Sequence, residues 1–493
     1  KATDFVVKLP KEYVEQMPKA QRKKMGQLFH KAGTARFMAE LFEIPSEIDS
    51  ISILDPGAGS GILAAAAVDR LEEIESIRTI YIVCYENNPD VAELLKSNLE
   101  WMKKHSEKEI SYELRQENYI FKQSENYNST FSAELNPQKY NIVISNPPYI
   151  KLPKTAPEAM SMQDVCYGAP NLYFLFARMS AFNLKENGEM VYKFPAHGRQ
   201  ERTSKKFRTN FFEEMALEHI HLFESRDKVF EIESVLQETM IFKAKKTQQK
   251  PSQILMTTTK NNSDFEGRTV FQAPYETVVS GTEDYVYLVT NEKEANVLRK
   301  NEWMEENAAT NRIENENGTD SDFRNKEALC DSAKMVQFRF YAQHIQNGNV
   351  VFPIGKENEY LVTNQMGLLQ KNTNYLFVKR FTAKEEHRRL QCGVYLARKN
   401  PKYNKISTQN KINFIEGIRE LSEVQFMVCM CIFNSTFYDM YYRMLNGSTQ
   451  VNSTEVNSMP VPSLDTIEAM GRKLLKVHDM SETECDKILE SYL

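Results

Sequence analysis

The feature that most constrains the fold is an apolar run, a glycine-rich turn and a helical run within residues 51–67. Residues 51–54 (ISIL) predict a short buried strand, which leads into the turn DPGAGSG at residues 55–61. Residues 62–67 (ILAAAA) favour a helix. Glycines let the backbone approach a ligand closely, and the free N–H groups at a helix start face that ligand. The segment therefore predicts a cofactor cradle in an α/β fold.

Strand and helix patterns continue to alternate up to about residue 243. Further apolar runs that predict strands lie at residues 80–85, 112–116, 142–145, 190–194, 217–223 and 234–243. This alternation is typical of a mostly parallel sheet with helices on both faces. A polar stretch at residues 243–251 then marks a boundary, so we expect a first domain at residues 1–247. Residues 248–493 carry shorter strands and a helical segment at 424–444, which indicates a second, mixed α+β domain.

The glycine turn and the next strand point to a cofactor other than a dinucleotide. The turn has the spacing G-x-G-x-G instead of the G-x-G-x-x-G of dinucleotide-binding proteins. Asp55, directly before the glycines, can hold an amino group of a ligand, whereas it would repel a phosphate. Glu86 ends the second predicted strand, where an acidic side chain can bind the two hydroxyls of a ribose. Glutamates at strand ends are also common on protein surfaces, so Glu86 alone does not decide the ligand.

A second group of residues is Asn-Pro-Pro-Tyr at 146–149, directly after the predicted strand at 142–145. Open α/β sheets bind their ligands at this carboxyl end of the strands. The amide oxygen of Asn146 and the carbonyl oxygen of Pro147 can accept hydrogen bonds from an exocyclic amine. The ring of Tyr149 can stack on the base that carries the amine. The alternative interpretation is an ordinary turn that the two prolines stiffen.

Charge and cysteine usage exclude several classes of protein. The net charge of the 493 residues is −5, which gives no global sign of a polyanionic partner. Residues 379–405 nevertheless hold nine lysines and arginines against two glutamates, as phosphate binding requires, with a solvated surface as the alternative. The seven cysteines are scattered, which argues against a disulfide framework or a metal site. No apolar run approaches the roughly 20 residues of a membrane span, so we expect a cytoplasmic protein in a reducing compartment.

Together these motifs resemble those of S-adenosylmethionine-dependent amino-methyltransferases. Gly26 and Gln27 before the glycine turn, and the long C-terminal part, are similar to γ-class DNA N6-adenine methyltransferases of type II restriction–modification systems. Within that class the chain resembles the PstI/BsuBI-type methylases, in length and in the segment GSTQVNSTE at 447–455. The resemblance implies a Rossmann-like methyltransferase domain with a mostly parallel seven-stranded sheet. It also implies that residues 248–493 form a mixed α+β target-recognition domain.

The resemblance further implies which residues bind S-adenosylmethionine. Asp55 matches the acid that contacts the methionine amino group, and Glu86 matches the residue that binds the ribose. Asn118 stands where the family usually has an aspartate, so a contact to the cofactor's adenine amine would run through an amide. The other matches to cofactor-binding positions are Phe29, Gly57, Gly59, Tyr119 and Phe176. A histidine replaces the usual threonine after Phe29, and plain core packing is the alternative for Phe176.

For the substrate, the resemblance implies that Asn146, Pro147 and Tyr149 hold an adenine that has flipped out of duplex DNA. Phe230 would line the same base, with core packing as its alternative. Basic residues of the second domain would contact DNA: Lys379, Arg380, Lys384, Arg388 and Arg389. Methylation of N6 would protect a bacterial chromosome from a partner restriction endonuclease that forms no stable complex with the enzyme.

Three rival functions fit parts of the same pattern. A protein-glutamine methyltransferase shares the Asn-Pro-Pro-Tyr loop, because a side-chain amide nitrogen poses a similar chemical problem, but such enzymes lack a C-terminal domain of this size. An RNA N6-adenine methyltransferase is a second rival, although no RNA-binding module is evident. The third is a catalytically silent DNA-specificity protein, against which the intact residues 55 and 146–149 argue.

Overall fold

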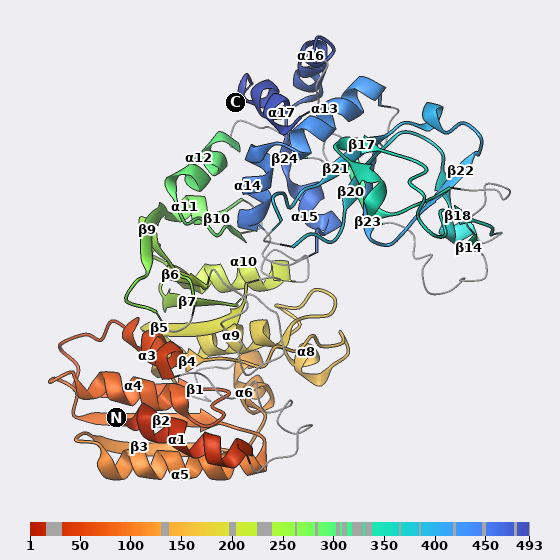
Figure 1. Cartoon of the computed structure of the whole chain (residues 1–493). Coiled ribbons are helices and arrows are strands. Elements are labelled where there is room, and N and C mark those ends of the chain that lie inside the picture. The colour runs from red at the N-terminus through yellow and green to blue at the C-terminus, as the bar shows by residue number, and fades with distance from the viewer. Residues whose placement is uncertain are drawn as a thin grey trace. The chain divides into compact units, whose positions relative to one another are not determined.

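The computed structural model forms two compact units, Lys1–Thr290 and Asn291–Leu493 (Figure 1). The residues that the structure describes are 1–15, 32–129, 138–196, 204–223, 239–261, 264–281, 284–301, 306–307, 313–317, 329–330, 338–363, 366–383, 386–417, 421–445, 450–477 and 481–492. None of the helices within these ranges combines the length and the apolar character that spanning a bilayer requires.

Within the described residues, the first unit is built on one sheet of nine strands in the order β3-β2-β1-β4-β5-β7-β6-β8-β9. These strands are β1 (Ser50–Asp55), β2 (Thr79–Tyr85), β3 (Glu109–Arg115), β4 (Tyr140–Ser145), β5 (Leu184–Pro195), β6 (Met215–Phe223), β7 (Thr239–Lys246), β8 (Gln253–Thr259) and β9 (Thr269–Pro274). Neighbours from β3 to β5 pair in parallel, whereas β7 and β9 run against the strands beside them. Strands β1 to β4 therefore all end at the same edge of the sheet.

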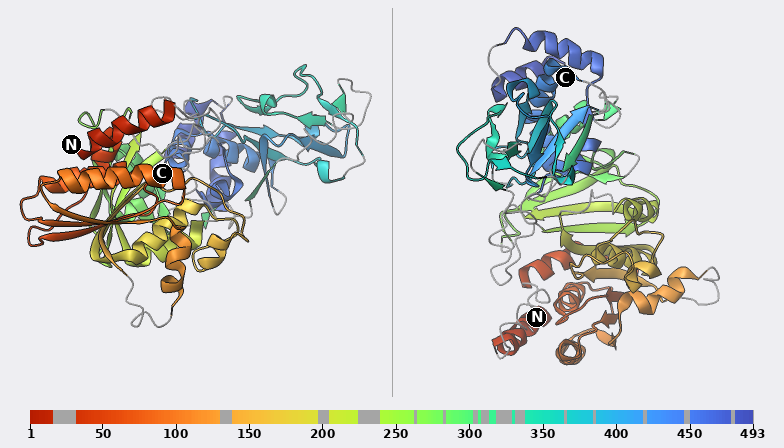
Figure 2. Two further views of the ribbon diagram at one scale, coloured as in Figure 1. Left: turned by 90° about the horizontal axis from the view of Figure 1, so that it is seen from below. Right: turned by 90° about the vertical axis from the view of Figure 1, so that its right-hand side faces the viewer.

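Helices cover both faces of this sheet (Figure 2). They are α1 (Ala2–Glu15), α3 (Ala32–Glu40), α4 (Ile62–Glu72), α5 (Pro89–His105), α6 (Tyr119–Asn128), α8 (Pro157–Ser161), α9 (Leu172–Asn183), α10 (Lys205–Glu214) and α11 (Tyr275–Val278), and a small ladder joins β10 (Val279–Ser280) to β11 (Tyr285–Val286). Successive strand residues point to opposite faces, so one strand contributes to two cores. Ile80 and Ile82 of β2 pack in the core under α1, α3, α4 and α5. Tyr85 of the same strand contacts Tyr119 of α6 on the other face, with ring centroids 5.0 Å apart.

The seven strands predicted from the apolar runs correspond to β1–β7, and the sheet then continues with β8 and β9. β8 pairs in parallel with β6, from Leu255 opposite His219 to Thr259 opposite Phe223. Ile254 of β8 is fully buried, which explains why this strand joins the first sheet instead of starting a new domain. Consequently the first unit continues to Thr290, past the boundary expected at residue 247. The polar stretch predicted as a linker is the end of β7 and the turn into β8.

The described part of the second unit contains a six-stranded sheet (β13-β23-β20-β21-β17-β16), a five-stranded sheet (β14-β18-β15-β22-β19) and the pair β12-β24. The strands are β12 (Glu306–Asn307), β13 (Ile313–Asn317), β14 (Leu329–Cys330), β15 (Phe338–Phe340), β16 (Ile345–Gln346), β17 (Gly348–Val350), β18 (Tyr360–Leu361), β19 (Gln370–Lys371), β20 (Tyr375–Lys379), β21 (Cys392–Tyr395), β22 (Lys405–Thr408), β23 (Ile412–Gly417) and β24 (Pro460–Val461). Aromatic side chains from both larger sheets share one core, in which Phe340 packs against Phe377 and Tyr395.

Helices complete the second unit. They are α12 (Glu292–Asn301), α13 (Glu423–Phe433), α14 (Thr436–Leu445), α15 (Ser453–Ser458), α16 (Leu464–Leu474) and α17 (Glu482–Glu490), with short 3-10 turns η4 (Ala342–His344), η5 (Met366–Leu368) and η6 (Ala397–Lys399). The helical segment predicted at 424–444 is two helices, α13 and α14. The break lies at Ser435, whose hydroxyl donates to the carbonyl of Ile432 and accepts the N–H of Tyr438. This side chain thereby ends one helix and begins the next.

Candidate cofactor and base-binding site

Four polar side chains lie at one edge of the first sheet, where four adjacent parallel strands end. Asp55 ends β1, Glu86 follows β2, Asn118 lies beyond β3 and Asn146 follows β4. β1 lies between β2 and β4 in the sheet. From β1 the chain first adds β2 and β3 on one side, and it then returns to add β4 and β5 on the other side of β1. Such a reversal of strand order creates a crevice beyond the carboxyl ends of the strands, where open α/β sheets bind ligands. The structure thus brings these four predicted positions to one edge.

The glycine turn between β1 and α4 has a shape that side chains would disturb. Gly61 has φ = +80°, and a Cβ atom there would come within 2.6 Å of Leu95 Cδ1. The turn is held from two sides: the N–H of Gly59 donates to Glu86 Oε2 at 3.1 Å, and the buried Asn98 donates to the carbonyl of Ser60 at 2.8 Å. The sequence needs glycine here because the backbone adopts a left-handed conformation under a close neighbour.

Asp55 is the acid of this sheet edge whose pKa is shifted most. Its side chain is fully buried, and neither carboxylate oxygen has a hydrogen-bonding partner within the described residues. Burial raises the pKa of Asp55 to about 8, the negative charge of Glu86 adds to the shift, and the nearby N–H of Gly57 partly offsets it. A buried acceptor without a donor is costly. This side chain is therefore suited to a ligand that brings a positively charged or neutral N–H donor.

Glu86 and Asn118 are both engaged in local hydrogen bonds. Glu86 accepts the N–H of Gly59 on one oxygen and the N–H of Asn88 on the other, and burial raises its pKa. Each carboxylate oxygen keeps a second lone pair, so ribose hydroxyls can still donate to Glu86. Asn118 caps α6 by accepting the N–H of Phe121 at 3.2 Å, and its amide nitrogen donates to Glu158 of α8 at 3.1 Å.

Of the three aromatic positions predicted for the cofactor, the two that the structure describes, Phe176 and Tyr119, differ in their surroundings. The ring of Phe176 lies beside the glycine turn, because a Cβ atom on Gly57 would stand 3.6 Å from Phe176 Cε1. Tyr119 is buried behind Phe176, with ring centroids 5.3 Å apart, and its hydroxyl donates to Asn183 at 2.8 Å. Phe176 is therefore placed to line a ligand on the turn, whereas the contacts of Tyr119 are those of a core residue that supports Phe176.

The loop after β4 holds Asn146 and Tyr149 in mutual contact. The hydroxyl of Tyr149 donates to Asn146 Oδ1 at 2.6 Å and lies 3.4 Å from the carbonyl oxygen of Lys193. Pro147 is buried, whereas Asn146 and Tyr149 are partly exposed. The ring of Tyr149 meets that of Tyr173 edge to face, with centroids 6.1 Å apart. An amide oxygen and an aromatic ring thus stand together at the carboxyl end of the strand next to Asp55.

Sequence reasoning missed one buried hydroxyl beside the site. Tyr192 of β5 is hydrogen-bonded to Ser180 at 2.5 Å and donates to the carbonyl of Phe176 at 3.3 Å. Burial raises the pKa of Tyr192, and the charge of Asp55 raises it further. Tyr192 therefore supports helix α9, which carries Phe176. The one sequence signal for this buried hydroxyl is a tyrosine in the middle of a strand that is otherwise mostly apolar.

Several predicted positions lie outside the described residues. These are Phe29, Phe230 and Lys384, together with Gly26, Gln27, His30 and residues 447–449. Their roles stay predictions.

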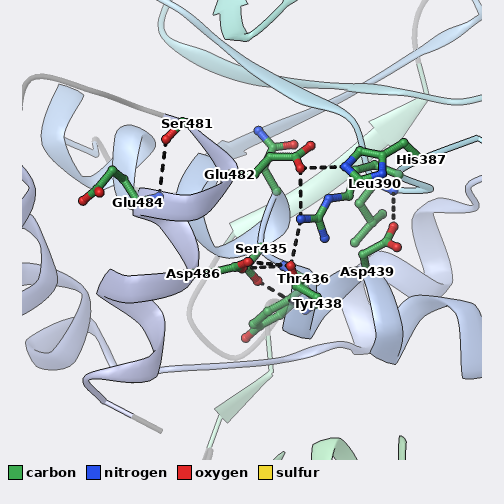
Figure 3. A network of polar contacts seen from close by, with 12 residues as sticks. His387, Leu390, Ser435, Thr436, Tyr438, Asp439, Ser481, Glu482, Glu484 and Asp486 are labelled. Carbon is green, nitrogen blue, oxygen red and sulfur yellow. Dashed lines mark hydrogen bonds and ion pairs between the residues drawn. The ribbon is translucent and has the colours of Figure 1, made fainter. Parts of the chain in front are cut away.

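Two of the arginines predicted to contact DNA are enclosed by the second unit. Arg389 is 1% exposed; its Nε donates to Thr382, and its backbone N–H donates to Asp439 at 2.6 Å. Arg388 donates to Thr436 at 2.8 Å and to Glu482 at 3.2 Å. Figure 3 shows His387 and Thr436 in the same polar network with Glu482, and Asp439 close by. In contrast to the expected exposed clamp, the side chain of Arg388 and the backbone of Arg389 join this loop to α14 and α17.

The other two described cations of that set lie at the surface, at the end of β20. Lys379 donates to Gln391 at 2.8 Å, and Arg380 donates to the carbonyl of Asn410 at 3.2 Å. Both are partly exposed, and the next residue, Phe381, is 49% exposed. These residues thus reach solvent at this corner of the six-stranded sheet, although Lys379 and Arg380 are also hydrogen-bonded within it.

Comparisons with known proteins agree with this architecture. A family model described as Eco57I restriction-modification methylase matches residues 67–230. The chain is 29% identical to the type II methyltransferase M.PstI of Providencia stuartii, over 96% of this chain and 93% of that protein. It is 27% identical to the type II methyltransferase M.BsuBI of Bacillus subtilis, over 96% of this chain and 94% of that protein. In fold the chain is similar to the type IIL restriction-modification enzyme MmeI, which was solved in complex with DNA, with a TM-score of 0.53. The two proteins are 10% identical, and the match covers 96% of this chain and 69% of the MmeI chain.

Proposed function

We propose that this chain, a type II methyltransferase homologous to M.PstI and M.BsuBI over nearly its full length, methylates N6 of adenine in duplex DNA. The homology makes it a DNA methyltransferase of a restriction–modification system and implies S-adenosylmethionine as its cofactor. The finer proposal, N6 of an adenine that leaves the duplex, rests on one observation. The buried, unpaired Asp55 ends β1, and Asn146 follows the adjacent parallel strand β4, at the same sheet edge.

The residues at the glycine turn fit S-adenosylmethionine. Asp55 would hold the ammonium group of its methionine part, because that cation supplies the donor that the buried carboxylate lacks. Glu86 would accept the ribose hydroxyls, and Phe176 would pack on the adenine ring beside the turn. When bound, the cofactor supplies an electrophilic methyl group on a sulfonium centre.

The loop at 146–149 supplies what the target nitrogen needs. The N6 lone pair of adenine is delocalised into the ring, so the amine is a poor nucleophile. Hydrogen bonds from N6 to Asn146 Oδ1 and to the carbonyl of Pro147 favour a pyramidal nitrogen whose lone pair points out of the ring plane. Catalysis then depends on positioning and fixed dipoles more than on a strong base.

The ring of Tyr149 is proposed to stack on the target base. A base inside a duplex is out of reach, and flipping it out costs a few kcal/mol of unstacking and unpairing. Stacking on an aromatic side chain offsets about 1–3 kcal/mol of that cost. Phe230 is the second aromatic residue proposed for this pocket.

The second unit is proposed to recognise the DNA target. Lys379 and Arg380 are the surface cations of the described set that would contact phosphates or base edges. Lys384, outside the described residues, stays a candidate. The relatives come from bacteria, and we expect this chain to act on a bacterial chromosome in the cytoplasm. A restriction endonuclease with the same target would then be its functional partner without a stable complex.

The deciding experiment incubates the purified protein with S-adenosylmethionine labelled in the methyl group and with duplex DNA, RNA or protein extract. We expect label in DNA only, and nucleoside analysis should identify N6-methyladenine. Label in protein or RNA but none in DNA would favour the glutamine or RNA methyltransferases. Asn146→Ala should abolish transfer yet largely preserve cofactor binding, measured by calorimetry. A wild-type protein that binds DNA but transfers nothing would be a silent specificity protein.

A further inference from the structure

Most of the exposed apolar side chains in the described part of the first unit lie on the segment that follows the Asn-Pro-Pro-Tyr loop or on the helix tied to it. In the described part of this unit, five large apolar side chains are exposed: Phe121, Ile150, Met160, Tyr167 and Val270. Three of them lie between β4 and α9, in the segment that starts at the end of the Asn-Pro-Pro-Tyr loop. Phe121 lies on α6, which is tied to α8 of that segment by the hydrogen bond from Asn118 to Glu158. Single exposed apolar residues need no explanation, but a concentration beside a proposed active site does.

Ile150 is the exposed residue next to the catalytic loop, and its backbone is fixed. Its side chain is 49% exposed, while its carbonyl accepts the N–H of Leu172 at 2.8 Å. One residue on, Lys151 forms an antiparallel bridge with Asn171, and the N–H of Leu152 donates to the carbonyl of Pro170 at 2.8 Å. This short ladder anchors the segment to the start of α9. The exposure of Ile150 is thus built into the fold.

The ladder also decides where Ile150 lies relative to Tyr149. In extended backbone, successive side chains point to opposite sides of the chain. The hydroxyl of Tyr149 reaches Asn146 and the carbonyl of Lys193, so Tyr149 lies on the side of the proposed base pocket. Ile150 leaves the chain on the other side, toward solvent. The two Cα atoms are only about 3.8 Å apart, so a duplex whose adenine reaches Tyr149 must pass close to Ile150.

We propose that Ile150 is a wedge that contacts the DNA base stack at the position from which the target adenine has left. This inference rests on the proposed function. Apolar side chains that enter a base stack support DNA in an unstacked state, and isoleucine has the shape and rigidity for this role. The neighbouring Lys151 and Lys154 are exposed cations, which suit the phosphates on either side of the opened position.

A wedge role for Ile150 predicts a substrate dependence that a purely structural role of this residue does not predict. If Ile150 stabilises the duplex after the base has left, its loss matters only when the target base must be pulled from a stable pair. A target adenine opposite an abasic site is already unpaired, and a defect caused by lost wedging should disappear there. A defect in folding, cofactor binding or the chemical step would remain on both substrates.

The test compares wild type, Ile150→Ala and Ile150→Leu in single-turnover methylation of two duplexes that differ only opposite the target adenine. On the paired duplex we expect Ile150→Ala to be slower by tenfold or more, and Ile150→Leu to stay within threefold of wild type. On the abasic duplex all three should agree within twofold. Val270→Ala, another exposed apolar residue of this unit but on β9, is the matched control and should behave as wild type on both.

A second readout follows the base itself. With 2-aminopurine at the target position, Ile150→Ala should show a smaller fluorescence increase on binding than wild type, at saturating protein. Equal slowing of Ile150→Ala on both duplexes, or full activity on the paired duplex, would overturn the wedge. If wild type methylated neither duplex, the proposed function would fail first, and the wedge with it. Thermal unfolding of each variant, expected to match wild type, separates these outcomes from misfolding.

Discussion

The hydroxyl of Tyr149 donates a hydrogen bond to Asn146 Oδ1 at 2.6 Å, so the acceptor proposed for the target amine is already bonded to a side chain of the same loop. This bond orients the amide with its oxygen toward Tyr149 before a base arrives. An incoming adenine must share Oδ1 with the hydroxyl by using the second lone pair of the amide oxygen, and the first hydrogen bond makes that oxygen a weaker acceptor. Tyr149 therefore combines two effects of opposite sign: its ring favours the bound base, and its hydroxyl competes with it.

Tyr149→Phe separates these effects. The ring stays, but the competing donor is lost, and a net hydrogen bond of about 0.5–1.5 kcal/mol corresponds to a roughly 2–10-fold change. We expect the apparent KM for DNA to decrease by about 2–10-fold, while kcat changes by a smaller factor. Tyr149→Ala removes the stack as well and should slow methylation by at least tenfold. Steady-state kinetics at saturating cofactor measure both, and a raised KM in Tyr149→Phe would contradict the competition.

Asp55→Asn should stabilise the protein in the absence of ligand. Burial raises the pKa of Asp55 from 3.8 to about 8, so the folded state holds a proton that the unfolded state releases between these values. The stability linked to this carboxyl is therefore complete below about pH 4 and is lost as the pH rises to about 8. We expect the variant to gain about 1–3 kcal/mol at pH 8 and almost nothing at pH 4. Urea unfolding at both pH values measures the difference.

The same substitution should weaken binding of S-adenosylmethionine. An ammonium group beside Asp55 favours the ionised carboxylate, so binding to wild type at pH 7 should release up to one proton. Titration calorimetry in buffers of different ionisation enthalpy counts this proton. In Asp55→Asn the release should vanish and the affinity should fall about 10–100-fold, as expected for a lost charge-assisted hydrogen bond. Unchanged proton release in the variant would exclude Asp55 as its source.

The arrangement of the site at one sheet edge could be predicted from the order of strands and polar residues. Parallel strands end at a common edge, so a residue after each strand is placed by topology alone, as Asp55 and Asn146 illustrate. Side-chain partners could not be predicted in this way. The bonds of Tyr149 to Asn146 and of Asn118 to Glu158 depend on the path of loops that have no regular pattern.

Counting charges could not separate surface cations from buried ones. Arg388 and Arg389 lie in the same basic stretch as Lys379, but the Arg388 side chain pairs with Glu482 and the Arg389 backbone N–H donates to Asp439, and both acids are distant in sequence. Such pairs form only when the loop docks on helices that come later in the chain. Likewise, the polar turn after β7 is typical of a linker, and only the pairing of β8 with β6 shows that the sheet continues.

Two buried histidines should make the first unit sensitive to acid. Burial lowers the pKa of His219 to about 4 and that of His221 to about 3. One ring nitrogen of each, Nε2 of His219 and Nδ1 of His221, is hydrogen-bonded to Thr257 Oγ1. In the unfolded chain these two histidines bind protons below about pH 6.5. In the folded chain they stay neutral until the pH reaches about 4 and about 3. Stability should therefore fall as the pH drops from about 6.5 to about 4, by about 1.4 kcal/mol per pH unit for each histidine.

Urea unfolding between pH 7 and pH 5 tests this dependence, with His221→Leu as the diagnostic variant. The substitution lowers stability at pH 7, because Thr257 loses a partner, but it also removes one titrating group. The slope of stability against pH should then drop by about 1.4 kcal/mol per unit. A slope equal to that of wild type would show that His221 does not resist protonation.

Substitutions in the basic stretch of the second unit should separate folding from DNA binding. Arg389→Ala leaves a cavity and removes the donor to Thr382, so we expect a loss of about 2–4 kcal/mol in stability. Lys379→Ala touches a partly exposed side chain and should change stability by less than about 1 kcal/mol. Its effect should appear in DNA binding, where losing one phosphate contact lowers the slope of log K against log salt by about 1. Fluorescence anisotropy at several salt concentrations measures this slope, and an unchanged slope in Lys379→Ala would remove this lysine from the DNA interface.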